Sequence, residues 1–208
     1  MVLSASTRGF SLNNQELRAL QKNNEKALEY YNYSLEIRKE LGNKRALPNT
    51  YNNIGLVHTN LENHKLAEEN LLKSASIALE MNDKRANAKA KSNLGDEYNR
   101  QKKYGQALEI LNEVIQTYKE INDGDGIVHA YNNRGQSYLG LKNYLAAKND
   151  CEKSLELAQV KGMLLSKQSA CQCLSTTWEN LGNARKSLKY YKMASTTKDS
   201  LFNQEKAD

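Results

Sequence analysis

The stretch Asn93-Leu94-Gly95 decides the fold, because it recurs forty residues away on either side as Asn53-Ile54-Gly55 and Asn133-Arg134-Gly135. A second series keeps the same interval and consists of four alanines: Ala27, Ala67, Ala107 and Ala147. Self-similarity at a period of roughly 20 to 50 residues marks a repeat architecture, in which each unit buries its apolar face only against its neighbours. The sequence therefore predicts an array of stacked repeats.

Each repeat divides into two amphipathic halves. In the second repeat, Tyr51, Ile54 and Val57 share one arc of a helical wheel, and the opposite arc is rich in asparagine. In the third repeat, Leu111 and Ile115 belong to an apolar stripe with spacings of three and four residues. We therefore expect two helices per repeat, a first helix A and a second helix B.

The matching breaks between these patterns give the expected helix boundaries. The B helices are expected at 24–41, 64–81, 104–121, 144–161 and 184 to about 205. The A helices are expected near 11–21, 48–61, 87–101, 127–141 and 167–181. Gly95 and Gly135 stand where helices A and B should approach closely, so a larger residue there is expected to overpack the contact.

The pattern resembles the tetratricopeptide repeat. The residues that carry the resemblance are Lys91-x-x-Leu94-Gly95-x-x-Tyr98 with Ala107-x-x-x-Leu111, and Tyr131-x-x-Arg134-Gly135-x-x-Tyr138 with Ala147-x-x-x-Cys151. The period is forty residues rather than about 34, and the proline that normally closes each repeat is missing. Longer helices, as in the kinesin light chain type of array, would accommodate the extra residues.

This resemblance implies an all-α fold, an α-α superhelix of about five helical hairpins with a right-handed twist. We expect a flexible segment at 1–10, a repeat domain at 11–205 and a tail at 206–208. The expected repeats are 11–45, 46–85, 86–125, 126–165 and 166–205.

The net charge of +6 raises nucleic acid as a partner, but the 30 Lys and Arg residues are interspersed with 24 Asp and Glu residues. No track of uncompensated basic residues appears in the expected groove, which disfavours phosphate binding. Three cysteines are an odd number in a chain too long to need disulfides, which favours a reducing compartment. No signal peptide or membrane span is visible, so a cytoplasmic location is expected.

The polar arc of the A helices supplies the candidate binding residues. Asparagine carries both a donor and an acceptor, so a row of asparagines can pair with the backbone of an extended peptide. Similar rows hold peptide in arrays of kinesin light chain and of O-linked N-acetylglucosamine transferase, so the resemblance implies a peptide in the concave groove. The candidates are Asn49, Asn52, Asn53, Lys89, Asn93, Asp96, Asn99, His129, Asn132, Asn133, Gln136 and Gln172.

The alternative for the asparagines is that they only bond a neighbouring helix or solvate the helix face. If they hold peptide, we expect Asn93→Ala and Asn133→Ala to weaken binding without lowering the melting temperature.

We expect no catalytic residues, no metal site and no cofactor. His58 and His64 occupy positions that carry aromatic residues in other repeats, which indicates a packing role. Cys171 and Cys173, two residues apart on a helix, point in different directions and do not form a chelating pair. The stretch Asp123-Gly124-Asp125-Gly126 resembles the start of a calcium loop, but no closing Glu follows, so an inter-repeat turn is expected.

The leading functional hypothesis is a non-catalytic protein- or peptide-binding module, the sensory or scaffolding part of a bacterial signalling protein. The last helix resembles segments that lead into a kinase, cyclase or DNA-binding output domain, so we expect the natural protein to continue. Its apolar residues Tyr190, Tyr191, Ala194, Leu201 and Phe202 also suggest a homodimer through this end. A purely structural self-association module, a free-standing adaptor or chaperone, and a nucleic-acid-binding protein remain as alternatives.

Overall fold

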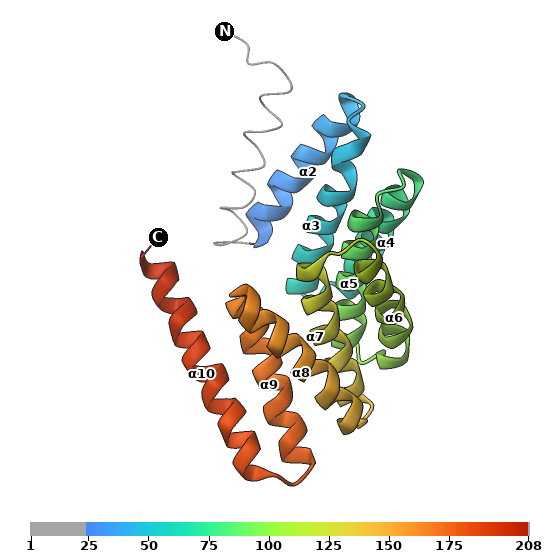
Figure 1. Cartoon of the computed structure of the whole chain (residues 1–208). Coiled ribbons are helices and arrows are strands. Elements are labelled where there is room, and N and C mark those ends of the chain that lie inside the picture. The colour runs from blue at the N-terminus through green and yellow to red at the C-terminus, as the bar shows by residue number, and fades with distance from the viewer. Residues whose placement is uncertain (1–23, 208) are drawn as a thin grey trace. The chain divides into compact units, whose positions relative to one another are not determined.

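The computed structural model describes residues 24–207, and helices make up nearly all of this range (Figure 1). The helices are α2 (Asn24–Glu40), α3 (Leu47–Asn60), α4 (His64–Glu80), α5 (Lys84–Arg100), α6 (Tyr104–Glu120), α7 (Gly124–Gly140), α8 (Tyr144–Lys161), α9 (Leu164–Asn180) and α10 (Ala184–Ala207). A short 3-10 turn, Lys44–Ala46, precedes α3. The predicted all-α class is confirmed. The predictions for 1–10 and 11–21 fall outside the described residues.

The chain falls into two compact units that divide within α5, between Glu97 and Tyr98, and each is described by itself. In the first unit, α3 packs against both α2 and α4. In the second unit, each helix from α6 to α10 packs against the next, and α7 also contacts α9. Contact between successive A helices, here α7 and α9, layers one hairpin on the following one, as expected of a helical repeat.

The B helices begin where the sequence predicts, but the A helices begin earlier. The starts of α5, α7 and α9 each precede the predicted residue by three positions, at Lys84, Gly124 and Leu164. The turn between repeats is shorter than the five-residue break assigned from the sequence, because one residue in it adopts a left-handed conformation. The next helix therefore starts almost at once.

This left-handed residue recurs every twenty residues, once after each helix from α2 to α9. The positions are Gly42, Glu62, Asn82, Lys102, Asn122, Lys142, Gly162 and Gly182, with φ between 53° and 75°. After α3, the Glu62 amide donates to Thr59 and the Asn63 amide donates to His58, which is the Schellman pattern of a helix end. The structural period is thus a single helix of twenty residues, half the period of the sequence.

Lys142 holds this conformation, with φ of 59°, at the cost of contact between its Cβ and its own backbone. Glycine avoids this cost, so we expect Lys142→Gly to raise the free energy of unfolding by about 0.5 to 1 kcal/mol. Urea denaturation measures the change. The matched control is Glu156→Gly, an exposed position inside α8, which should lose about 1 kcal/mol. Destabilisation by both changes would contradict this account of the turns.

Close helix contacts form at small residues, as the sequence predicts. A Cβ built on Gly135 would lie 2.4 Å from Cys151 Sγ, and one built on Gly55 would lie 2.7 Å from Leu71 Cγ. The four alanines of the second series, Ala27, Ala67, Ala107 and Ala147, are fully buried. The predicted approach of helices A and B is confirmed at these two glycines, whereas the contact at Gly95 stays a prediction.

A disulfide joins Cys151 of α8 to Cys173 of α9, and both residues are buried. Cys171 is a free buried thiol, and burial raises its pKa. The expectation that a chain of this length forms no disulfide is wrong here, because α8 and α9 pack with these two side chains facing each other. Such bonds are typical of oxidising compartments, so the cytoplasmic location stays a prediction without support from this feature.

Arg134 replaces the apolar residue that stands at the same position in three other repeats, as Ile54, Leu94 and Leu174. Its guanidinium forms a two-pronged ion pair with Asp150, with Nε 2.7 Å from Oδ2 and Nη2 2.9 Å from Oδ1. The bond to Asp150 raises the pKa of Arg134. Buried charges need such partners, so the departure from the repeat motif is compensated within the same hairpin.

The two histidines of the first unit differ in role. His58 has a buried Nδ1 with no hydrogen-bond partner, and burial lowers its pKa, which fits the predicted packing role. His64 instead lies with Nδ1 2.6 Å from the Glu97 carboxylate, so its interpretation as a packing residue is wrong.

Candidate peptide-binding surface

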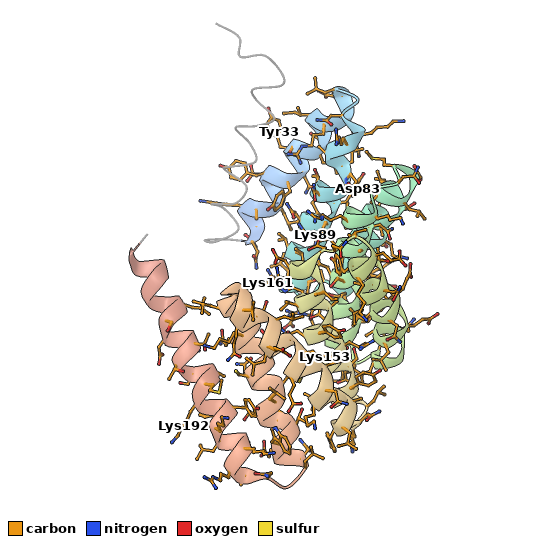
Figure 2. All side chains as sticks on the ribbon, viewed as in Figure 1. Tyr33, Asp83, Lys89, Lys153, Lys161 and Lys192 are labelled. Carbon is orange, nitrogen blue, oxygen red and sulfur yellow. A yellow bond between two sulfur atoms is a disulfide. The ribbon has the colours of Figure 1, made fainter. Side chains whose placement is uncertain are left out.

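The A helices present a polar stripe, here called the A-helix stripe, formed by the second, sixth and ninth positions of each motif when the recurrent glycine (Gly55, Gly95 or Gly135) is counted as the eighth. The ninth position of the second repeat is the apolar Leu56 and is not part of the stripe. Spacings of four and three residues place these positions on one side of a helix. In the first unit the stripe contains Asn49, Asn53, Lys89, Asn93 and Asp96, and in the second unit His129, Asn133 and Gln136. All of them are half-buried or exposed. Figure 2 shows Lys89 with the side chains around it.

Asn52 and Asn132 do not belong to this accessible surface. Their exposed fractions are only 2% and 6%. In the first unit, the Asn93 side-chain amide donates to Asn52 Oδ1 at 2.7 Å, and in the second, the Asn132 amide donates to the Ser166 carbonyl at 3.1 Å. These asparagines therefore connect one A helix to the next, which is the alternative weighed for them above.

The Asn99 side chain also makes hydrogen bonds to a neighbouring helix, within the second unit. Its amide donates to the Asn133 carbonyl at 2.7 Å, and its Oδ1 accepts from the Ser137 hydroxyl at 2.7 Å. A ligand would have to break both bonds to use this side chain. The position therefore serves the packing of α5 residues 98–100 on α7.

Five predicted residues are well exposed: Asn49, Lys89, His129, Gln136 and Gln172. Asn93 is half-buried and uses its amide nitrogen on Asn52, but its Oδ1 accepts no hydrogen bond from the described residues. The side chains thus offer neutral donors and acceptors in each unit, with one cation, Lys89, and one anion, Asp96, on α5. Such a surface suits hydrogen bonding to a peptide backbone better than binding of a phosphate track.

The asparagine series ends in the last repeat, where Cys173 takes the sixth position and is bound in the disulfide to Cys151. Cys173 is 1% exposed, so it offers nothing to a ligand. In α9 only Gln172, at the fifth position, remains accessible among the predicted residues. The series of asparagines is therefore shorter than the series of repeats.

Glu97 was not predicted as a site residue. It is fully buried, at a position held by Val57, Ser137 and Thr177 in three other repeats. Its carboxylate accepts from Thr59 Oγ1 at 2.7 Å and lies 2.6 Å from His64 Nδ1. Because no substrate reaches a carboxylate with no exposed surface, this cluster is structural. The signal was present in the sequence as an acidic residue at a position where Val57, Ser137 and Thr177 are all uncharged.

No group of three or more His, Cys, Asp or Glu side chains within residues 24–201, where side chains are described, has the arrangement of a metal site. Asp123, the start of the calcium-like stretch, instead caps α7 by accepting from the Gly126 amide at 3.0 Å. The predicted turn at this position is therefore a helix cap. None of the helices in the described part of the chain combines the length and hydropathy needed to cross a membrane.

Solved structures share this fold at low sequence identity. A Rap protein complexed with Competence and Sporulation Factor superposes with a TM-score of 0.84 at 13% identity, over 94% of this chain and 55% of the Rap chain. A putative kinesin light chain of Podospora anserina with nearly identical TPR-like repeats gives 0.71 at 11% identity, over 97% of this chain and 100% of that one. This chain thus spans about half of the Rap protein.

A third structure is a signal-transduction ATPase from Pyrococcus horikoshii with a tetratricopeptide repeat sensor. It gives a TM-score of 0.69 at 18% identity, over 88% of this chain and 28% of the ATPase. At such identities these likenesses concern the fold alone. No curated protein sequence matches the chain significantly.

Family models match the sequence directly. One tetratricopeptide repeat model matches residues 16–80 and 46–120, and a second matches residues 128–161. Together with the helical hairpins, the glycine contacts and the layered A helices, these matches show that the chain belongs to the tetratricopeptide repeat family.

Proposed function

We propose that this chain is a non-catalytic module that binds a protein or an extended peptide on the A-helix stripe. The observation that carries the proposal is the contrast between the two sides of each A helix. One side is buried against neighbouring helices, while the other offers accessible amide, imidazole and amino groups in register from one repeat to the next. Repeats of this kind use their concave surface for binding.

The finer part of the proposal is a sensory or scaffolding role in a bacterial signal-transduction protein. Two structural relatives support it, a Rap protein solved with a named factor and an ATPase whose repeats are described as a sensor. Both contain more chain than the part matched here, so an output domain beyond these repeats is part of the proposal.

The binding test uses exposed residues whose loss should not disturb the helices. A peptide selected from a display library on the whole chain is titrated by calorimetry against Lys89→Ala and Gln136→Ala. Each lost hydrogen bond should cost about 0.5 to 1.5 kcal/mol of binding free energy. The matched controls are Lys65→Ala on α4 and Gln159→Ala on α8, both exposed on B helices. Equal losses in the controls would contradict the proposed site.

Asn93→Ala should lower the stability of the protein, in contrast to the expectation from the sequence alone that the melting temperature stays unchanged. Because Asn93 donates to the buried Asn52 Oδ1, its removal should lower the free energy of unfolding by about 1 to 3 kcal/mol as well as weaken binding. Thermal denaturation and calorimetry on the same variant separate the two effects. An unchanged melting temperature would contradict the interhelical bond.

The salt dependence of binding separates this function from nucleic-acid binding, the alternative raised by the net charge of +6. Phosphate contacts release counterions, so the affinity for nucleic acid falls steeply as salt rises. Binding of a peptide by neutral amides should change little over the same range.

A further inference from the structure

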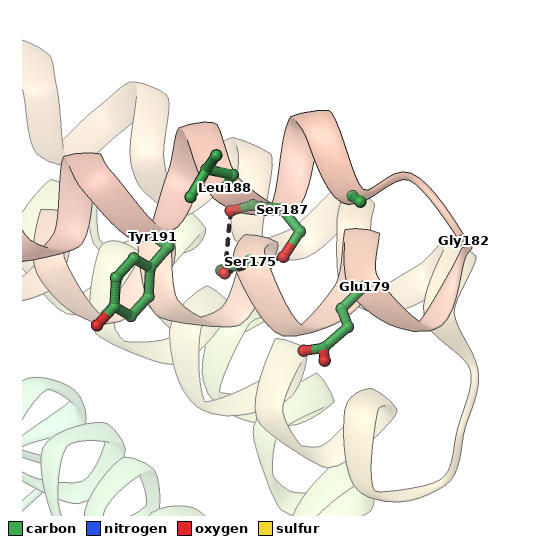
Figure 3. Close-up of a pocket in the computed structure, with 7 residues that line it drawn as sticks. Ser175, Glu179, Gly182, Ser187, Leu188 and Tyr191 are labelled. Carbon is green, nitrogen blue, oxygen red and sulfur yellow. Dashed lines mark hydrogen bonds between the residues drawn. The ribbon is translucent and has the colours of Figure 1, made fainter.

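The last hairpin, α9 and α10, carries a second candidate interaction surface. A groove of about 390 Å³ runs between these helices. It is lined by Ser175 and Glu179 of α9 and by Ser187, Leu188 and Tyr191 of α10. We call it the terminal groove. Figure 3 shows Tyr191 and Glu179 toward its two ends, with the hydrogen-bonded hydroxyls of Ser175 and Ser187 between them.

Comparison with equivalent positions in the earlier repeats shows which part of the groove is unusually exposed. The residues equivalent to Tyr191 in the preceding B helices are Tyr31, Leu71, Leu111 and Cys151, and each is at most 1% exposed. Tyr191 itself is 64% exposed, and Leu188 beside it is 53% exposed. In the preceding repeat, the equivalent Cys151 contacts both Gly135 of its own helix A and Cys173 of the following helix A. Each following helix A packs against the B helix before it, α7 against α6 and α9 against α8. The terminal groove therefore continues an interface that the fold has already built, and its natural occupant is a helix.

The apolar surface differs from the one expected from the sequence. Ala194 is 5% exposed, and Tyr190 packs against the core cluster that contains Leu174. Neither side chain is therefore available to a partner. The side chain of Phe202 lies outside the described residues. Leu188, which was not among the residues singled out from the sequence, is the exposed apolar residue beside Tyr191.

Charge decides which helix fits. Between Ala184 and Lys198, α10 contains five basic residues and no acidic one: Arg185, Lys186, Lys189, Lys192 and Lys198. Helical spacing places Arg185, Lys189 and Lys192 along one edge of the groove, next to Leu188. Over the same length, α2, α4 and α8 contain residues of both signs, and α6 contains only the acidic Glu109 and Glu113. A docked helix thus needs acidic residues on the side that faces this edge.

We propose that the terminal groove binds an acidic amphipathic helix of a partner protein, seated as the helix A of a following repeat would be. The partner carries a small residue over Ser175 and Ser187 and an apolar residue against Leu188 and Tyr191. A second copy of this chain fits less well, because its net charge is +6. The groove involves different residues from the A-helix stripe, so the proposal does not depend on the function proposed above.

The test uses a defined probe, a fluorescein-labelled peptide of 17 residues that keeps the buried residues of α7, including Val128, Tyr131 and Gly135, at their own spacing. Glutamate occupies its exposed positions, and a companion peptide has lysine there. Fluorescence anisotropy with the whole chain should show that the acidic peptide binds about tenfold or more tightly than the basic one at low salt. The difference should shrink at high salt because the charges are exposed.

Variants locate the site. Leu188→Ala with Tyr191→Ala, and separately Lys189→Glu with Lys192→Glu, should each weaken binding of the acidic peptide about tenfold. The matched controls are Leu145→Ala, 65% exposed on α8, and Lys65→Glu on α4, which should leave the affinity unchanged. All of these positions are exposed, so circular dichroism should show folded protein throughout.

Two results would overturn the proposal. One is absence of saturable binding, or equal affinity of the acidic and basic peptides for the wild-type chain. The other is a dimer in sedimentation velocity that Leu188→Ala with Tyr191→Ala dissolves, since the occupant would then be a second copy.

Discussion

Arg134→Leu should lower the free energy of unfolding by about 3 kcal/mol or more, even though leucine is the residue that the repeat motif favours at this position. The change leaves the Asp150 carboxylate, whose side chain is only 5% exposed, without its guanidinium partner. Arg134 also donates to Asn112 Oδ1 at 2.7 Å, and this bond is lost as well. Urea denaturation of the whole chain measures the effect.

A second substitution tests the reason for this loss. Arg134→Leu combined with Asp150→Ile recreates the apolar pair that the third repeat carries as Leu94 and Ile110. Replacing a buried ion pair by apolar residues is often neutral or stabilising, so the double variant should recover most of the lost stability. A double variant no more stable than Arg134→Leu would contradict the ion pair as the cause.

Reduction of the disulfide between Cys151 and Cys173 should lower the stability of the second unit by about 3 kcal/mol, because the bond closes a loop with a sequence separation of 22 residues. The protein is unfolded with reductant, refolded under reducing conditions and compared with the oxidised protein by thermal denaturation. The melting temperature of the reduced protein should be several degrees lower.

Counting thiols provides the control for this prediction. Unfolded, unreduced protein should react with one equivalent of a thiol reagent, at Cys171, and fully reduced protein with three. Cys171→Ala should bring the first number to zero without changing the effect of reductant on stability. Three reactive thiols in the unreduced protein would show that the bond does not form.

The period of forty residues was enough to predict the helical hairpins, because small residues at fixed positions report where two backbones approach. Gly55 and Gly135 illustrate this, since each faces a side chain of its own helix B. The predicted starts of the A helices were three residues late because the turns before them are shorter than expected. Each turn depends on a left-handed φ at a residue such as Asn82, and an asparagine side chain suits a longer polar turn equally well.

The disulfide escaped prediction for a different reason. Cys151 stands at a core position of α8, equivalent to Leu111, and Cys173 stands in the asparagine series of α9. Neither position belongs to a spacing that repeats, so only the packing of α8 on α9 brings the sulfurs together. A sequence that carries one such pair gives no periodic signal.

The candidate site was predictable only in part. A helical wheel assigns the A-helix stripe, and Lys89 and Gln136 are exposed as expected. The wheel treats each helix in isolation, however, so it could not tell that a neighbouring A helix covers Asn52 and Asn132. For the same reason the wheel could not predict the hydrogen bond between Asn93 and Asn52, two residues 41 positions apart in sequence on different helices.

The most direct test of binding on the A-helix stripe is a titration of the ¹⁵N-labelled chain with the selected peptide, followed by the side-chain amide signals of asparagine and glutamine in NMR spectra. The signals of Asn53, Asn93 and Gln136 should shift on binding. Those of Asn70 on α4 and Gln159 on α8 should not. Shifts confined to the B-helix signals would contradict the proposed site.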